Sequence, residues 1–231
     1  MYHDSVYPVS QTGSTGMAFE AGASGKNLTE WQFGMASLNP RWNVSGTYMQ
    51  VLPSFISTDQ DGNDEKEFLL DYFNELPDLL SMVFLKGYQW PFDVNKIFGG
   101  SSVIDLLVYQ ETVLKKRRVF LDYRVNPGNL EKDRDLPYAS MIPEAKEYLS
   151  QAGACFGTPI ERLKHINEPA ILFYQDHHVD LFKERLEIAV CANIITVVCP
   201  PTIYGKPISL VFTRSEKCVQ VMELQDLAEL L

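Results

Sequence analysis

Two hydrophobic periodicities alternate along this chain, and together they limit the folds it can adopt. Apolar residues recur at helical spacing in four segments, which cover residues 65–84, 101–116, 143–151 and 158–179. Short runs rich in β-branched and aromatic residues, typical of strands, cover 41–56, 117–124 and 187–192. A chain that mixes helices and strands in this order is predicted to have an α+β fold.

The limits of several helices are predicted by local signals. Pro77 is expected to divide the first helical segment into two helices, because proline lacks a backbone N–H and clashes with the preceding turn. Ser101 or Ser102 is expected to cap the next helix. Thr158, followed three positions later by Glu161, predicts a capping box.

The composition narrows the class of protein. The chain has 231 residues, 45% of them hydrophobic, which suffices for one large domain or two small ones with a buried core. Its formal net charge of -10 argues against nucleic-acid binding, since that partner needs a basic face. No run reaches the ~18 apolar residues of a membrane span, and MYHDSVYPVS does not resemble a secretory signal. A cytoplasmic location is therefore expected.

Motifs for metal or nucleotide chemistry are not found in the sequence. It has no glycine-rich dinucleotide fingerprint and no phosphate-binding loop. The four cysteines form no CxxC pair, so buried thiols are expected and a metal site is not. DQDGNDEKE, at residues 59–67, alternates acidic groups like a calcium loop but lacks the terminal glutamate, and we interpret it as a polar turn. The pair His177-His178 is interpreted as a solvated helix end.

The basic run KKRR, at residues 115–118, admits two interpretations. Arg117 and Arg118 stand before an apolar strand and would suit bidentate binding of a carboxylate. The run also fits the solvated end of a helix, where basic groups complement the helix dipole. The second interpretation is favoured.

Three blocks, in the same order along the chain, resemble one known family. QTGSTGMAFEAGASGKNLTEWQF, at residues 11–33, is similar to its T-G-D-G-x-A-M-A-x-x-A-G-A stretch, and RRVFLDYR, at 117–124, resembles its V-Y-L-D-L strand. RLKHINEPAILFYQDHHVDLFKERLEIAVCA, at 162–192, resembles the segment that returns to its cofactor domain. The family is that of the fumarate reductase and succinate dehydrogenase flavoproteins. These are FAD-dependent oxidoreductases whose FAD domain is interrupted by a substrate-capping domain.

The resemblance extends over about residues 1–192. Three further phrases, KNLTEWQFGMAS, STDQDGNDEKEFL and KGYQWPFD, are similar to an uncharacterised bacterial branch of these flavoproteins. The resemblance to the family implies an incomplete two-domain flavoprotein. Its parts are a remnant of the FAD-binding domain, a capping domain, a return strand and a tail. The corresponding ranges are 1–40, 41–186, 187–192 and 193–231.

The resemblance also implies a reaction and a cofactor. Hydride would pass between FAD and a small carboxylate in the intact relative, with the protein positioning the substrate. Residues expected near the cofactor are Thr12, Gly13 and Gly16. The arginines proposed for contact with the substrate anion are Arg41, Arg118 and Arg124.

Two departures from the family pattern limit the expected activity. The glycine-rich turn and helix that bind the FAD pyrophosphate do not precede Tyr2, so this chain is not expected to retain FAD. The family's catalytic arginine, expected about ten positions before the residue that resembles its glutamate, Glu111, falls near Ser101-Ser102. The catalytic residue is therefore unknown, and we expect the chain to be inactive alone.

The tail differs from the family in a way that a lost base explains. After Ala192 the family reads Q-H-N-N-G-G, and the same codons shifted by one base encode NIITVV, which is residues 193–198. The segment LVFTRSEKCVQVMELQDLAELL, at 210–231, is obtained with the same offset from a family segment that binds FAD. We therefore expect residues 193–231 to be a frame-shifted, non-native translation. The alternative is a real but divergent C-terminus.

A different class of function stays open. The aromatic phrases WQF, RWNVSGTY and GYQWPFD would suit a free-standing binding module if their rings were exposed, because aromatic residues are enriched at interface cores. Buried rings would indicate an ordinary core, which is the favoured interpretation. A decayed gene product is a further alternative.

Overall fold

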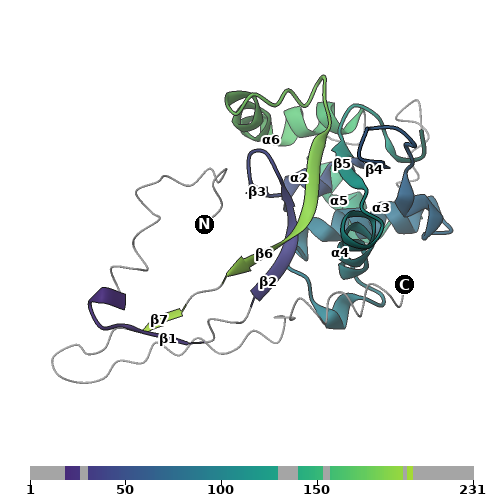
Figure 1. Cartoon of the computed structure of the whole chain (residues 1–231). Helices are drawn as coiled ribbons and strands as arrows, with labels where there is room; N and C mark the ends of the chain where they lie inside the picture. Colours follow the sequence, from purple (N-terminus) through teal and green to yellow (C-terminus); the bar gives the residue numbers. More distant parts are fainter. Residues whose placement is uncertain (1–18, 27–30, 130–139, 153–156, 195–196, 200–231) are drawn as a thin grey trace.

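The centre of the protein is a five-stranded antiparallel sheet (Figure 1). The computed structural model describes residues 19–26, 31–129, 140–152, 157–194 and 197–199. The sheet has the strand order β3-β2-β6-β5-β4. Its strands are β2 (Trp31–Ser37), β3 (Trp42–Asn43), β4 (Ser54–Thr58), β5 (Arg118–Asp122) and β6 (Leu186–Ile194).

Along the chain, β2 is the first strand of this sheet and β6 is the last, and the two strands are neighbours. They pair over seven positions, from Trp31 opposite Ile194 to Ser37 opposite Ile188. A separate two-stranded ribbon joins β1 (Ser24–Lys26) to β7 (Val197–Cys199), also antiparallel. Figure 1 shows this ribbon apart from the body, on the side toward which β6 points.

Five helices accompany the sheet in the part of the chain that the structure describes. They are α2 (Thr47–Gln50), α3 (Leu76–Tyr88), α4 (Ser102–Tyr109), α5 (Pro143–Gln151) and α6 (Pro159–Asp176). α4 continues without interruption into a π-helical turn, Gln110–Leu114. Short 3-10 turns cover Phe68–Asp71, Val94–Lys96 and Pro127–Asn129. The mixture of helices and antiparallel strands confirms the predicted α+β class.

Alternate residues of the strands enter one core shared with the helices. Successive side chains of a strand point to opposite faces, so Val119 and Leu121 of β5 are buried in this core. Arg118 and Phe120 lie on the other face of the same strand. The helices contribute large apolar side chains to the core, among them Leu80, Phe84, Ile104, Val108, Leu163 and Ile171.

The strand or hairpin predicted over residues 41–56 is wrong in its middle. Strands β3 and β4 do form, but they lie at opposite edges of the sheet and helix α2 separates them. Tyr48 and Met49 of α2 are buried, and α2 packs against α3. A helical turn therefore interrupts the segment whose partial alternation predicted strands.

The division predicted near Pro77 is confirmed, because α3 begins at Leu76 and is separate from the helical turn before it. Pro77 lies in the first turn of α3, where its missing N–H removes no intrahelical hydrogen bond. Of the helix expected before it, only the 3-10 turn Phe68–Asp71 forms.

The predicted helix starts at Ser101 and Thr158 have different outcomes. Thr158 caps α6, with its backbone N–H donating to Glu161 Oε2 at 2.7 Å, and the capping box is confirmed. Ser101 is the N-cap residue of α4, but its hydroxyl donates to Gln89 Oε1 at 3.0 Å instead of capping the helix. The predicted helix over 143–151 and the strand over 187–192 are confirmed.

Part of the sequence-based account lies outside the described residues. This is the case for Thr12, Gly13 and Gly16, and for most of the segment 193–231. The first two residues of that segment complete β6 and pair with the start of β2. Because β2 and β6 share one sheet with β4 and β5, the described body extends from residue 31 to residue 194.

Candidate functional site

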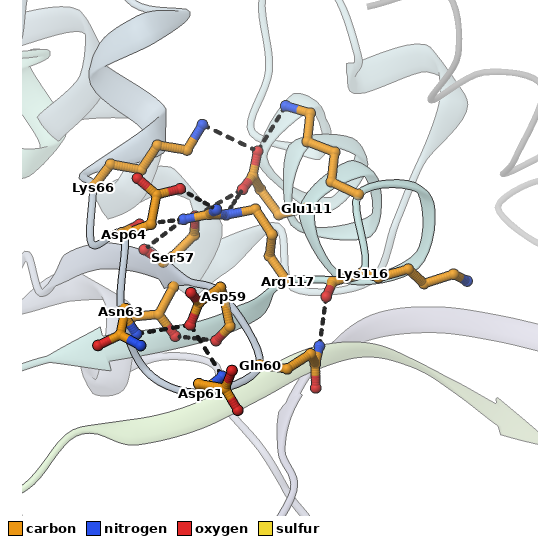
Figure 2. A network of polar contacts seen from close by, with 12 residues as sticks. Ser57, Asp59, Gln60, Asp61, Asn63, Asp64, Lys66, Glu111, Lys116 and Arg117 are labelled. Atoms are coloured by element: carbon orange, nitrogen blue, oxygen red, sulfur yellow. Dashed lines mark hydrogen bonds and ion pairs between the residues drawn. The ribbon is translucent and has the colours of Figure 1, made fainter.

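A network of charged side chains surrounds Glu111, which lies in the π-helical turn after α4 (Figure 2). Its carboxylate is almost completely buried. Oε2 accepts a hydrogen bond from Ser57 Oγ at 2.7 Å, and Oε1 accepts one from Lys115 Nζ at 2.7 Å. Lys66 Nζ lies 3.8 Å from Oε1. Because π-helical turns are rare and often occur at functional sites, this network is a candidate functional site.

Arg117 connects Glu111 to the turn that follows β4. Its Nε lies 3.2 Å from Glu111 Oε2 and donates to Ser57 Oγ at 2.9 Å. Its Nη1 donates to Asp64 Oδ2 at 2.7 Å, and its Nη2 donates to the backbone oxygen of Asp64. Figure 2 shows the guanidinium between the two carboxylates. One side chain thus joins β4, the turn and the π-helix.

The turn itself is organised by Asp59. Its Oδ1 accepts hydrogen bonds from the backbone N–H of Asp61 at 3.0 Å and of Asn63 at 2.7 Å. Gln60 donates from Nε2 to the backbone oxygen of Lys116 at 2.5 Å, which ties the turn to the end of the π-helix. The polar turn predicted from DQDGND is confirmed.

The electrostatics of the network keep Glu111 ionised. Burial alone would raise the pKa of its carboxyl, but hydrogen bonds from Lys115 and Ser57, with the charges of Lys115 and Lys66, outweigh burial. The pKa of Glu111 is therefore below its ordinary value. A carboxylate held in this state by several donors is poorly suited to act as a general base at neutral pH. The network is better explained as an electrostatic clamp that fixes the π-helix against β4.

A second cluster lies at the far end of β5, around the buried carboxylate of Asp122. Oδ2 accepts from Arg124 Nη2 at 2.7 Å and from Arg185 Nε at 2.8 Å. Arg185 also binds Glu65 bidentately, with both distances 2.7 Å. Burial would raise the pKa of Asp122, but the hydrogen bonds from Arg124 and Arg185 hold the pKa below its ordinary value. This cluster joins the segment after β4 to the segment before β6.

The three arginines proposed for substrate contact are not brought together. Arg118 and Arg124 lie at opposite ends of β5, and Arg41 stands beside β3, three strands away in the sheet. Arg118 forms a bidentate pair with Glu187, at 2.7 and 2.8 Å, and Arg124 binds Asp122. Arg41 is buried and donates from Nη1 to Asn43 Oδ1 at 3.2 Å. Arg118 and Arg124 therefore each bind a carboxylate of the chain itself.

A buried ion pair that the sequence did not indicate joins α3 to α4. Lys86 and Asp105 are both fully buried, and Nζ lies 2.5 Å from Oδ2. Lys86 also donates to the backbone oxygen of Gln89 at 2.9 Å. Burial lowers the pKa of Lys86 and raises the pKa of Asp105 to about 6 despite the neighbouring ammonium. In the sequence, Lys86 and Asp105 are one charged residue in or directly beside each of two predicted helices. That pattern does not distinguish a buried ion pair from two surface charges.

The loop between α3 and α4 is fixed at both ends by further polar contacts. Ser101 donates through its backbone N–H and its hydroxyl to Gln89 Oε1, at 3.1 and 3.0 Å. Ser102 Oγ accepts from the backbone N–H of Asp93 at 3.0 Å. Trp90 Nε1 donates to the backbone oxygen of Met35 at 2.9 Å, which attaches the loop to β2.

The aromatic phrases divide between core and surface. Tyr48 is buried, and Trp42 and Trp90 are partly buried. Phe92 is also buried, whereas Tyr88 is exposed at 60%. Phe98, which lies just beyond the last phrase, is exposed at 85%. The side chains of Trp31 and Phe33 lie outside the described part. Most of the described rings of these phrases are therefore buried or partly buried, as the favoured interpretation held, and Tyr88 is the exposed one among them.

His177 and His178 are exposed at the end of α6, which confirms the solvated helix end. Within the described ranges, no group of three His, Cys, Asp or Glu residues is arranged to hold a metal ion. No helix in these ranges is long and apolar enough to cross a membrane.

Comparison with protein-family models, with curated proteins and with solved structures finds no match to this chain. The resemblance to flavoproteins therefore stays a prediction from the quoted motifs.

Proposed function

We propose that this chain is the substrate-capping domain of an FAD-dependent oxidoreductase of the fumarate reductase and succinate dehydrogenase flavoprotein type, with fragments of the FAD-binding domain that it interrupts. The observation that carries this proposal is the pairing of its incoming and outgoing strands. A domain inserted into another must receive the chain and return it at nearly the same place.

The described strands satisfy this requirement where β2 and β6 pair. β2 and β6 pair over seven positions at the boundary of the body, and five of these pairs, from Phe33 with Ala192 to Ser37 with Ile188, lie before the tail that begins at residue 193. These strands fall in or directly beside the two sequence blocks, 11–33 and 162–192, that resemble the junctions of the family. The adjacency of β2 and β6, together with these motif blocks, supports the proposal of an inserted domain.

The cofactor side of the proposal concerns residues outside the described part. Binding of FAD is assigned to Thr12, Gly13 and Gly16 and to the interrupted domain, on the resemblance of the block 11–33 to the family. Bound flavin supplies hydride transfer to or from a small unsaturated or saturated carboxylate. The capping domain closes over that substrate and keeps water out. No catalytic residue is assigned.

Among the three candidate arginines, Arg118 is best placed to meet a substrate anion. Its partner Glu187 is partly exposed, and a solvent-accessible ion pair contributes only about 0–1 kcal/mol, so a competing carboxylate displaces it at low cost. Arg124 binds the buried Asp122, which is harder to displace. Chain 1–231 by itself is expected to be inactive and to bind no FAD.

The test is a flavin assay on two proteins. One is chain 1–231, and the other is the product of the longest reading frame of the locus that contains residues 1–192. After gel filtration, each is scanned for visible flavin absorption. Near-stoichiometric flavin in the longer product, with none in chain 1–231, supports the proposal. A longer product that carries no flavin after reconstitution with FAD contradicts it.

A binding module is the second candidate, and one observation favours it. Tyr88 and Phe98 expose large apolar rings on a loop that is fixed at both ends. Flavin in chain 1–231 or its longer product would argue against this candidate as the whole function.

A further inference from the structure

An ion pair that reaches solvent lies on the face of the sheet opposite the core. Arg118 of β5 donates from Nε to Glu187 Oε1 at 2.8 Å and from Nη2 to Glu187 Oε2 at 2.7 Å. Glu187 stands directly opposite Phe120 in the antiparallel pairing of β5 with β6, so the three side chains share one face of the sheet. Both members of the ion pair are accessible, with 37% and 31% of their side chains exposed.

The ring of Phe120 supports the guanidinium of Arg118. The central carbon of the guanidinium lies over this ring, 5.0 Å from its centroid. A guanidinium that stacks on an aromatic face has a fixed plane, and its edge presents two parallel N–H donors to a carboxylate. Arg118 and Phe120 therefore provide the planar, oriented donors that bidentate recognition of a carboxylate requires.

The arginines of the two charged clusters, by contrast, are committed to buried carboxylates. Arg124 binds Asp122, whose side chain is 1% exposed, and Arg117 lies beside Glu111, at 2%. A ligand that displaced either carboxylate would leave a buried charge without its partner, which is strongly unfavourable. Glu187 instead turns into water when it leaves its arginine, so its displacement costs little.

We propose that Arg118 and Phe120 form a binding site for a carboxylate ligand, and that Glu187 occupies this site from within the chain until the ligand displaces it. The class of ligand rests on the proposed function, in which the substrate is a small carboxylate. Displacement exchanges one carboxylate for another on the same two donors, so Arg118 keeps its number of hydrogen bonds. Glu187 is then an intramolecular competitor that sets how tightly the site binds.

The competition predicts that removing the Glu187 carboxylate strengthens the binding of a carboxylate from solution. Because an exposed ion pair is weak, Glu187→Gln should lower the dissociation constant of acetate by about two- to fivefold. Arg118→Lys keeps the positive charge but loses the planar pair of donors, so it should weaken the binding of acetate. Arg118→Gln, which removes the charge as well, should abolish it.

The experiment titrates isotope-labelled chain 1–231 with sodium acetate, while sodium chloride keeps the ionic strength constant. The Nε–H resonance of Arg118 reports binding by NMR, and the backbone resonance of Phe120 replaces it in the two variants of Arg118. The matched control is Glu184→Gln, which removes the same charge from an exposed residue three positions before Glu187. The unfolding midpoint of each variant verifies that it is folded.

The outcomes separate this inference from the proposed function. Saturable binding that tightens in Glu187→Gln, stays unchanged in Glu184→Gln and weakens in Arg118→Lys supports the inference. Equal tightening in both glutamate variants would reflect net charge alone and overturn it, as would binding that is insensitive to the variants of Arg118. If acetate binds in this way but the longer product carries no flavin, the site stands and the flavoprotein proposal fails. Flavin in the longer product without acetate binding at Arg118 overturns only the inference.

Discussion

The Lys86 ammonium and the Asp105 carboxylate form an ion pair with no exposure to solvent, and Nζ lies 2.5 Å from Oδ2. The pair connects the last turn of α3 to the first turn of α4. Burying two charges costs several kcal/mol each, and their mutual attraction offsets this cost only while both are present. The pair therefore makes the position of the intervening loop dependent on both residues.

Removing one member of this pair should be worse than removing both. We expect Lys86→Met or Asp105→Leu alone to lower the free energy of unfolding by about 3–5 kcal/mol, because each leaves an uncompensated buried charge. The double variant should recover most of that loss. Urea unfolding of the four proteins gives the coupling energy directly. Additive losses would show that the two charges do not depend on one another.

The Glu111 network predicts a loss of stability in acid. The pKa of Glu111 is lower in the folded protein than its ordinary value of 4.5, so the unfolded chain takes up this proton first as the pH falls. The stabilisation is complete above the ordinary value and declines below it. Glu111→Gln should cost about 3 kcal/mol near neutral pH, and the difference from the unmodified protein should shrink in acid.

The control for Glu111 is Glu187→Gln, which breaks the partly exposed pair with Arg118. Such pairs contribute about 0–1 kcal/mol, so a much smaller effect is expected. Urea unfolding over a range of pH values measures both variants. A pH-independent difference for Glu111→Gln would mean that the carboxylate is not stabilised in its ionised form.

The contact between Gly34 and Trp90 predicts an intolerance of side chains at position 34. A Cβ added to Gly34 would lie 2.7 Å from the Trp90 ring, which is closer than real contacts allow. Gly34→Ala should therefore lower the free energy of unfolding by about 1–3 kcal/mol and shift the fluorescence of Trp90. Adding Trp90→Leu should relieve the clash. If Gly34→Ala is neutral, the loop does not hold Trp90 against β2 as described.

The capping box of α6 provides a prediction that is independent of the loop. Thr158→Ala should lower the free energy of unfolding by about 1 kcal/mol, because it leaves a helix N–H without its side-chain acceptor. Thr158→Ser, which retains the hydroxyl, should be close to the unmodified protein. Thermal or urea unfolding distinguishes the two. Equal losses would point to the methyl group instead of the cap.

The sequence predicted the elements whose signals are local. The capping box at Thr158, the polar turn after β4 and the helix over 143–151 each depend on a few neighbouring residues, and each was found. The hairpin over 41–56 failed because β3 and β4 pair with β2 and β5 instead of with each other. Strand partners are chosen by contacts distant in sequence, which local alternation does not encode.

The candidate site was harder to predict for the same reason. Ser57, Glu111 and Arg117 meet only because β4, the π-helix and the start of β5 are adjacent in space. The proposed arginines were chosen for their chemistry, but their acceptors were not visible in the sequence. Two of them bind carboxylates supplied by other parts of the chain, Glu187 and Asp122.

The central claim is that this chain is an inserted piece of a longer flavoprotein, and the nucleotide sequence of its locus tests that claim most directly. We predict one additional base near the codon of Ala192, which restores the family reading frame in place of residues 193–231. We also predict an in-frame coding region for a glycine-rich βαβ unit upstream of Met1. A locus confirmed base by base as it stands, without such a region, would contradict the claim.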